Sequence, residues 1–331
     1  MNYLLLSSAA LLLLHTPLSA VEPTPHSMMV TNTQNVVEIT APTFWDVAYG
    51  PHPKQVIHFW KVETEKPSPL LIFIHGGSWT GGCRTDFRFC ALLPHLLKAK
   101  ISVASVEYRF IQETTADGVV PPVKGCLLDA ARAVQFIRTK AKEWNIDKER
   151  IALTGGSAGA CSSLWLAFHD DLADPQNPDP IARESTRVLC AAVAIAQTTL
   201  DPQQMIEWTP NSTYGGHAFG FKGDREKKLS SFAVYLSNRD KILPWIAEYS
   251  PYALVTKDDP PVYLFYNSPP ALGQKQKDPT HTSNFGVKLQ ERCTSLGVAC
   301  ELYYPGAPDA KHKTVQDYLI DRLTGRSVGE K

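Results

Sequence analysis

The sequence LTGGSAGA, from Leu153 to Ala160, decides the fold of this chain. It contains the pattern Gly-x-Ser-x-Gly, with Ser157 at its centre and Gly155 and Gly159 on either side. A serine in a sharp turn between a strand and a helix has strained backbone geometry, so the residues two before and two after it must be small. An apolar run precedes the motif and a helical pattern follows it, as such a turn requires. The pattern therefore predicts a serine nucleophile at the end of a strand.

A glycine-rich turn can also serve other purposes. The glycines could form a tight turn that packs a helix closely against a sheet. The segment does not have the Gly-x-Gly-x-x-Gly spacing of a dinucleotide site, and no Gly-Lys-Ser/Thr of a phosphate loop follows it. The choice therefore lies between a nucleophile and a purely structural turn.

A second glycine motif lies upstream in HGGSW, which runs from His75 to Trp79. It follows the apolar run LLIFI, which predicts a buried strand. Adjacent glycines let backbone N–H groups turn toward an oxyanion, so Gly76 and Gly77, with the N–H of Ala158, form the predicted oxyanion hole. His75 is interpreted as a structural residue that orients the loop, and Trp79 as a residue of the substrate pocket. The alternative is that the glycines only terminate the strand.

Short apolar runs alternate with longer helical patterns over most of the chain. Continuous apolar runs are typical of central strands in a parallel sheet that is covered on both faces. The alternation predicts an α/β fold, with a mostly parallel central sheet and helices on both faces. The predicted strands are 70–77, 101–108, 151–156, 189–196, 262–266 and 300–306. The predicted helices are 123–144, one that begins at Ser157, and one from Ser283 to Gly297.

Three segments interrupt the alternation. Residues 23–62 predict amino-terminal antiparallel strands, and residues 171–185 predict a polar surface loop. Residues 201–256 predict an insertion that acts as a lid or binds substrate. Its aromatic residues could line an acyl pocket, or they could form the core of the insertion. These residues are Trp208, Tyr214, Phe219, Phe221, Phe232 and Tyr235.

The first residues have the layout of a secretory signal peptide. Residues 1–20 contain an apolar run, then Pro17, then the small residues Ser19 and Ala20. Residues 21–331 are then a single domain, exported to the periplasm or the extracellular space. The alternative is an uncleaved amino-terminal anchor. No second long apolar stretch follows, so we expect no stable insertion into a membrane after cleavage.

Charge and cysteine content restrict the partners. The chain has 33 lysines and arginines and 33 aspartates and glutamates, so electrostatics give no reason to expect nucleic acid as a partner. No Cys-x-x-Cys or His-Glu-x-x-His occurs, and we expect no metal and no other cofactor. Two pairs among the seven cysteines are close enough in sequence for a local disulfide: Cys83 with Cys90, and Cys293 with Cys300.

The motifs HGGSW, VEYRF and GGSAGA, with the late helix and strand pattern, resemble the α/β-hydrolase fold, on the hormone-sensitive-lipase and carbohydrate-esterase side. The resemblance covers most of residues 45–325 and is least specific over 201–256. It implies that the acid and the base follow the serine in the order serine, aspartate or glutamate, histidine. It also implies an acid after the penultimate strand and a histidine after the last one. Within VEYRF, Arg109 is expected to form a buried ion pair with Asp129, although both charges could instead be exposed.

This order selects the histidine. The last predicted strand is CELYYPG, and His312 is the histidine beyond it, so His312 is the predicted base. His281 is the alternative, but it directly precedes a predicted helix and is interpreted as a residue of the preceding loop.

The acid is selected in the same way. Asp278, followed by Pro279, is similar to the Asp-Pro of the family's acid loop and is the predicted acid, although this loop is several residues longer than usual. Asp309 is the alternative because it is close to His312. Asp258 and Asp259 precede the strand and so lie at the wrong end of a parallel sheet.

Together these expectations describe a serine-dependent carboxylester hydrolase. The resemblance implies removal of acetyl or feruloyl groups from a carbohydrate or small ester through an acyl-enzyme on Ser157. Two alternatives stay open. One is an exopeptidase of the same fold, which needs a group, such as paired glutamates, to bind the peptide amino terminus. The other is a non-catalytic binding protein with this fold, although such proteins typically lose the serine or the histidine.

Overall fold

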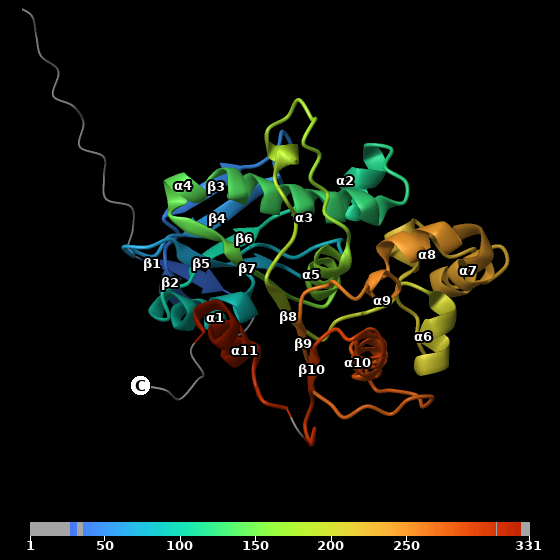
Figure 1. The fold of residues 1–331 in the computed structure, drawn as a ribbon. Coiled ribbons are helices and arrows are strands. Elements are labelled where there is room, and N and C mark those ends of the chain that lie inside the picture. The colour runs from blue at the N-terminus through green and yellow to red at the C-terminus, as the bar shows by residue number, and fades with distance from the viewer. Residues whose placement is uncertain (1–26, 32–35, 309, 326–331) are drawn as a thin grey trace, which may run out of the picture.

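The chain is built around one large β-sheet (Figure 1). The computed structural model describes residues 27–31, 36–308 and 310–325. Residues 1–20 and Asp309, on which two of the expectations above depend, lie outside these residues. The strands of the described part are β1 (Ser27–Thr31), β2 (Val36–Thr40), β3 (Phe44–Ala48), β4 (Val56–Trp60), β5 (Ser68–Ile74), β6 (Ser102–Val106), β7 (Ile146–Gly156), β8 (Cys190–Ala194), β9 (Val262–Phe265) and β10 (Cys300–Tyr303).

The large sheet is mostly parallel. Its strand order is β10-β9-β8-β7-β5-β6-β4-β3, and β1 and β2 form a separate antiparallel pair. Strands β5 to β10 are parallel to one another, while β4 is antiparallel to both β6 and β3 at one edge. The predictions of a mostly parallel sheet and of amino-terminal antiparallel strands are therefore confirmed. Parallel strands place all their carboxyl ends at one edge of the sheet, where ligands of such folds bind.

Helices cover both faces of this sheet. Figure 1 shows α1 and α11 beside each other on one face, with α3 and α5 on the opposite one. The predicted helix 123–144 is present as α3 and α4, and the predicted helices after Ser157 and Ser283 are α5 and α10. The helices are α1 (Phe87–Lys98), α2 (Ile111–Ala116), α3 (Pro122–Thr139), α4 (Ala141–Trp144), α5 (Ala158–Phe168), α6 (Pro202–Trp208), α7 (Ser231–Ser237), α8 (Leu243–Tyr249), α9 (Pro251–Leu254), α10 (Asn284–Leu296) and α11 (Val315–Thr324), with short 3-10 turns at Ile181–Arg183, Gly216–Phe219 and Arg239–Ile242.

The central strand β5 shows why its sequence is apolar throughout. Side chains alternate between the faces of a strand. Leu70 and Ile72 belong to the core that includes α3, α5 and α10, while Leu71 and Phe73 belong to the core beneath α1 and α11. All four side chains are buried. A strand with two buried faces cannot alternate apolar with polar residues, and this explains the continuous apolar runs.

Helices α6 to α9 lie between β8 and β9, and Figure 1 shows them grouped together at one end of the molecule. Their aromatic residues mostly form a core. Trp208, Phe219, Phe232 and Tyr235 are buried, and Phe221 packs against the same core. The interpretation of these aromatics as core residues is thus confirmed, with Tyr214 as the exception described below. A lid function of residues 201–256 stays a prediction.

The expected ion pair between Arg109 and Asp129 is present. Arg109 Nε and Nη2 donate to the two Asp129 carboxylate oxygens at 2.8 and 2.6 Å, and only 2% of Asp129 is exposed. Gln55 Nε2 donates a further hydrogen bond to Asp129 at 2.7 Å. The hydrogen bonds that Arg109 makes to Asp129 raise the pKa of the guanidinium above its usual range. The pair fixes the end of β6 to α3.

Asp129→Ala should therefore destabilise the protein strongly. It leaves the Arg109 guanidinium without its buried partner, and we expect the free energy of unfolding to fall by about 3–5 kcal/mol. Asp117→Ala is the matched control, because Asp117 binds the same guanidinium at 3.0 Å with a half-exposed carboxylate. We expect the control to cost less than about 1 kcal/mol. Urea unfolding measures both, and equal losses would contradict a structural role that is specific to Asp129.

Candidate active site

Ser157 occupies a sharp turn between β7 and α5, at the carboxyl edge of the sheet. Its backbone angles are φ 54° and ψ −122°, a region that non-glycine residues rarely adopt. A Cβ atom at Gly155 or Gly159 would lie 2.4 or 2.1 Å from the Ile74 carbonyl oxygen. Both positions therefore require glycine, which confirms the steric basis of the predicted turn.

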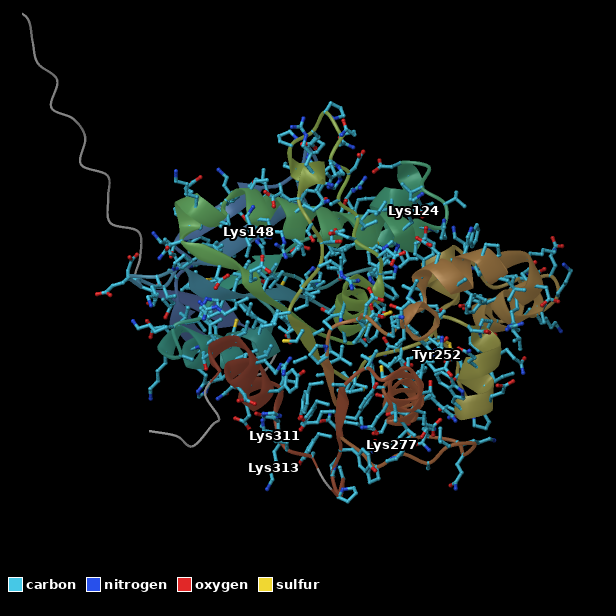
Figure 2. The ribbon with its side chains drawn as sticks, in the orientation of Figure 1. Lys124, Lys148, Tyr252, Lys277, Lys311 and Lys313 are labelled. Carbon is cyan, nitrogen blue, oxygen red and sulfur yellow. The ribbon has the colours of Figure 1, made fainter. Side chains whose placement is uncertain are left out.

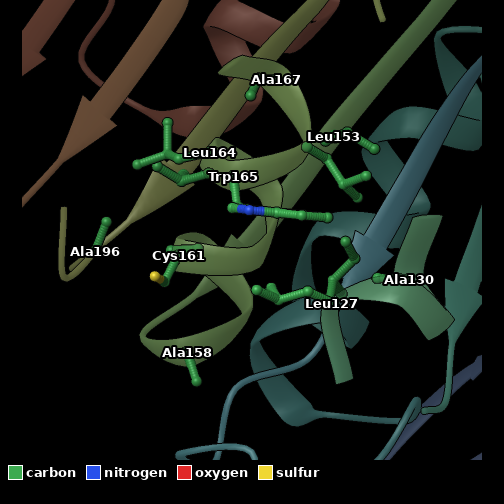
Figure 3. Close-up of a cluster of buried hydrophobic side chains, with 14 of the residues drawn as sticks. Leu127, Ala130, Leu153, Ala158, Cys161, Leu164, Trp165, Ala167 and Ala196 are labelled. Carbon is green, nitrogen blue, oxygen red and sulfur yellow. The ribbon is translucent and has the colours of Figure 1, made fainter. Parts of the chain in front are cut away.

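Helix α5, which begins directly after Ser157, holds this turn in place. All its residues are buried, and Figure 3 shows Cys161, Leu164 and Trp165 of this helix in the buried cluster with Leu127 and Ala130. A helix buried on every side has no freedom to shift without disrupting its neighbours. The rigid packing of α5 explains how the strained geometry of Ser157 persists.

The histidine beside Ser157 is His281. Its Nε2 lies 2.9 Å from Ser157 Oγ, and its Nδ1 lies 2.8 Å from Asp278 Oδ2. A carboxylate oxygen can only accept, so Nδ1 carries the proton of a neutral ring and Nε2 is left to accept from the Ser157 hydroxyl. Asp278, His281 and Ser157 thus form one hydrogen-bonded chain in the order that nucleophilic catalysis requires.

Asp278 is held in its ionised form by its surroundings. Burial of the carboxyl would raise its pKa, but hydrogen bonds from the His281 ring and from the backbone N–H groups of Thr280 and His281 outweigh burial. The pKa of Asp278 therefore lies below its usual value. The structure brings Asp278 and Ser157 together as predicted, through a different histidine from the predicted one.

The expectation that His312 lies beside Ser157 is wrong. His312 is buried, with Nδ1 2.8 Å from Glu301 Oε2 and Nε2 3.0 Å from Asp321 Oδ2. Asp321 also accepts from Lys311 Nζ at 2.7 Å, and Figure 2 shows Lys311 on the loop that leads to α11. Both ring nitrogens of His312 are thus engaged by carboxylates, which link β10 to α11. The alternative acid Asp309 cannot be placed, because it lies outside the described residues.

The reason for this error is the length of the loop after β9. The resemblance implied a histidine after the last strand, but here the loop between β9 and α10 carries both Asp278 and His281. The two are three residues apart, so one turn of chain brings the ring to the carboxylate. The unusual loop length and a histidine within it were the signals in the sequence that pointed to this arrangement.

The HGG loop lies directly against the serine turn. A Cβ atom at Gly76 would lie 2.5 Å from the Gly156 carbonyl oxygen and 3.5 Å from Ser157 Cβ. Gly77 has φ +106°, where a side chain would be strained and would meet the Gly81 carbonyl. Gly76, Gly77 and Ser157 line one cavity, while Ala158 is the residue that follows the serine. These positions are those expected of an oxyanion hole, and their role as donors stays a prediction.

His75 anchors this loop from beneath. It is fully buried, its Nε2 lies 3.0 Å from Glu107 Oε1, and its ring stacks on Tyr108 at 4.4 Å. Burial would raise the pKa of Glu107, but hydrogen bonds from His75 and from the Arg84 backbone outweigh it, so this pKa is lowered. The interpretation of His75 as a structural residue is confirmed by these contacts.

Trp79 does not line the pocket, contrary to expectation. Its side chain is fully buried, and its Nε1 donates to Ser162 Oγ on α5 at 2.9 Å. Trp79 therefore fixes the HGG loop to α5. Its position directly after Gly76 and Gly77 suggested a place in the pocket. The direction of its side chain instead depends on packing against α5, which lies far along the chain.

A cavity of about 830 Å³ opens at Ser157 and His281, within the range of small-molecule sites. One part of it is lined by apolar residues of β5, α1, β9 and α11. Tyr214 is the aromatic residue of segment 201–256 that reaches this cavity. We call the apolar part the apolar arm, and define it by Phe73, Phe89, Leu92, Phe265 and Val315.

Three further findings concern the thiols, possible metal ligands and possible membrane spans of the described residues. The seven cysteines, all within the described residues, are free thiols, so neither of the two candidate pairs forms a disulfide. Among the described residues there is no group of three or more histidine, cysteine or acidic side chains placed to bind a metal ion. In the same part of the chain no helix has the length and apolar character needed to cross a membrane.

Comparison with known proteins now adds to this geometry. The BD-FAE family model matches residues 57–271, which is more than half of the chain and includes both glycine motifs. The chain belongs to the BD-FAE family. The family match ends at residue 271, before Asp278 and His281. The place of these two residues beside Ser157 therefore rests on the geometry of the structure alone.

Individual curated relatives resemble this BD-FAE protein over half of its length or less. Esterase LipC of Mycobacterium tuberculosis is 31% identical over 153 residues, which are 45% of this chain and 35% of LipC. The chain spans between 28% and 46% of the length of such curated relatives.

Solved structures extend the likeness to the whole fold. A truncated carbohydrate esterase from gut microbiota has a TM-score of 0.61 at 18% identity and covers 85% of this chain and 96% of its own. An acetyl ester-xyloside bifunctional hydrolase from Caldicellulosiruptor lactoaceticus has a TM-score of 0.55 at 21% identity, over 92% and 95% of the two chains. These likenesses confirm the predicted α/β-hydrolase fold of this BD-FAE protein.

Proposed function

We propose that this protein is a serine carboxylester hydrolase, with Ser157 as nucleophile, His281 as general base and Asp278 as the residue that orients the base. The observation that carries the proposal is the hydrogen-bonded chain Asp278–His281–Ser157, with distances of 2.8 and 2.9 Å. The names of its relatives as esterases support the same reaction class.

The proposed reaction has two halves. In the first, Ser157 Oγ attacks the ester carbonyl carbon while its proton passes to His281 Nε2. The oxyanion that forms accepts hydrogen bonds from the N–H groups of Gly76, Gly77 and Ala158. The carbon–oxygen bond to the alcohol then breaks, and the alcohol leaves with the proton from His281. In the second half water loses a proton to His281, attacks the acyl-serine and releases the carboxylic acid, and the proton returns to Ser157.

The substrate we propose is an acyl ester of a carbohydrate or a small alcohol, with acetyl and feruloyl groups as candidates. Carbohydrate and acetyl ester hydrolases among the solved structures of this fold support that class. We also propose that residues 1–20 direct export to the periplasm or the extracellular space, where polymeric carbohydrate is accessible. Residues 21–331 then form the mature domain.

The geometry favours this function over the two alternatives. Among the cavity-lining residues Asp86 is the acidic side chain, so the lining does not offer the paired glutamates that an aminopeptidase would use. A non-catalytic binding protein would have no need for the aligned serine, histidine and aspartate.

Covalent labelling tests the proposal directly. A fluorophosphonate probe should add one phosphonyl group to the peptide that contains Ser157, and hydrolysis of p-nitrophenyl esters should be lost in proportion. The control is Ser163→Ala, which removes a buried hydroxyl on the same helix that donates to the Gly159 carbonyl. The control should label as the wild type does. Label on another serine, or activity that survives complete labelling of Ser157, would refute the assignment.

A further inference from the structure

The apolar arm offers more aromatic and aliphatic surface than an acetyl group can contact. Phe73 and Phe89, which line it, are buried, and their rings stack with centroids 4.6 Å apart. Phe265 stacks on Tyr303 at 5.4 Å along one side. An acetyl group ends at the methyl carbon next to the reacting carbonyl, so it is too short to extend along a separate apolar part of the cavity.

The two outer walls of the arm come from different helices. Leu92 lies on α1, and Val315 is the first residue of α11. Both side chains are partly buried and pack against the core that contains Phe73 and Phe89. Figure 1 shows the two helices beside each other, and they pack together in the structure. Leu92 and Val315 therefore contribute partly buried apolar side chains to the arm from two neighbouring helices.

Lining chemistry indicates which part of an ester enters the arm. Sugars need hydrogen-bonding partners, whereas the arm offers aromatic rings and aliphatic groups, which favour burial of hydrocarbon. The buried rings of Phe73 and Phe89 belong to its lining, so it is poorly suited to a carbohydrate chain that continues beyond the ester into solvent. The alcohol therefore binds in the rest of the cavity, outside the apolar arm, from which it can leave before water attacks the acyl-serine.

We propose that the apolar arm binds the acyl group, that the preferred acyl group is longer than acetyl, and that Leu92 and Val315 determine its size. The inference rests on the proposed function and deepens it by naming the residues that select the substrate. Each buried methylene group contributes up to about fourfold to kcat/KM. The wild-type protein should therefore hydrolyse p-nitrophenyl hexanoate with a kcat/KM about tenfold or more above that for the acetate.

The test compares matched variants on one helix. Leu92→Trp fills the arm, whereas Leu97→Trp places the same bulk on α1 at a partly buried position that does not line the cavity. We expect Leu92→Trp to lower kcat/KM for the hexanoate about tenfold and to leave the acetate within about twofold. Leu97→Trp should leave the ratio between the two substrates as in the wild type. Val315→Phe fills the arm from the α11 side and should act like Leu92→Trp, should that variant fail to fold.

The outcomes separate this inference from the proposed function. Wild-type protein that hydrolyses acetate best, or arm variants that lower both esters equally, would overturn the role of the arm and leave the serine hydrolase mechanism intact. Wild-type protein that hydrolyses no ester of any length and takes up no phosphonate on Ser157 would overturn both.

Discussion

His281→Gln should lower kcat for ester hydrolysis by about 10⁴-fold or more, because the side chain that accepts the Ser157 proton is removed. His312→Gln, the same substitution at the histidine after the last strand, should change kcat by less than about tenfold. The difference follows from geometry, since Ser157 Oγ lies 2.9 Å from His281 Nε2, whereas both nitrogens of His312 are bound by Glu301 and Asp321. Steady-state hydrolysis of p-nitrophenyl acetate and butyrate measures both.

The two variants should also separate in stability. His312 is buried between two carboxylates, and glutamine retains only part of their hydrogen bonding. The free energy of unfolding of His312→Gln should fall by about 1–3 kcal/mol. His281 lies in a partly exposed loop, so His281→Gln should lose less than about 1 kcal/mol. A folded His312→Gln protein with kcat reduced as far as that of His281→Gln would show that His312 takes part in the chemistry.

The features predictable from the sequence share a physical cause, which is local steric restriction. Gly155 and Gly159 leave no room for a Cβ atom next to the Ile74 carbonyl, and only such a restriction forces glycine at both positions around Ser157. Burial on two faces likewise explains the apolar strands of the parallel sheet. These constraints act over a few residues, so the mostly parallel sheet of the α/β fold, the serine turn and the HGG loop could be derived from short motifs.

The features that were predicted wrongly depend on contacts between distant segments. His281 reaches Ser157 across 124 positions of sequence, and the rule that places the base after the last strand selects His312 instead. His312 appears free in the sequence because its partners Glu301 and Asp321 are 11 and 9 positions away. Trp79 was assigned to the pocket by its position in the chain, but its Ser162 partner lies 83 positions later. The path of a long loop and the direction of a side chain follow from tertiary packing.

Ser157→Ala and Ser157→Gly should both lower kcat/KM by about 10⁴-fold or more, because neither can form the acyl-enzyme. At a normal helical site, a glycine variant is about 1 kcal/mol less stable than the alanine variant. At Ser157 we expect the reverse order, with the glycine variant more stable. At φ 54° and ψ −122°, alanine keeps the backbone strain of serine and glycine relieves it. We expect Ser157→Gly to exceed Ser157→Ala by about 1 kcal/mol in free energy of unfolding.

Ser163 supplies the reference for this comparison, since it lies within α5 and is buried, with Oγ donating to the Gly159 carbonyl at 2.8 Å. There Ser163→Gly should be less stable than Ser163→Ala by about 1 kcal/mol. Reversal of the order at Ser157 alone, measured by urea unfolding, would establish that the turn stores strain in the folded state. The same order at both sites would mean that the serine turn is unstrained. Exposure of the nucleophile would then be due to the close contact of the Gly155 and Gly159 backbone with β5, rather than to the conformation of Ser157 itself.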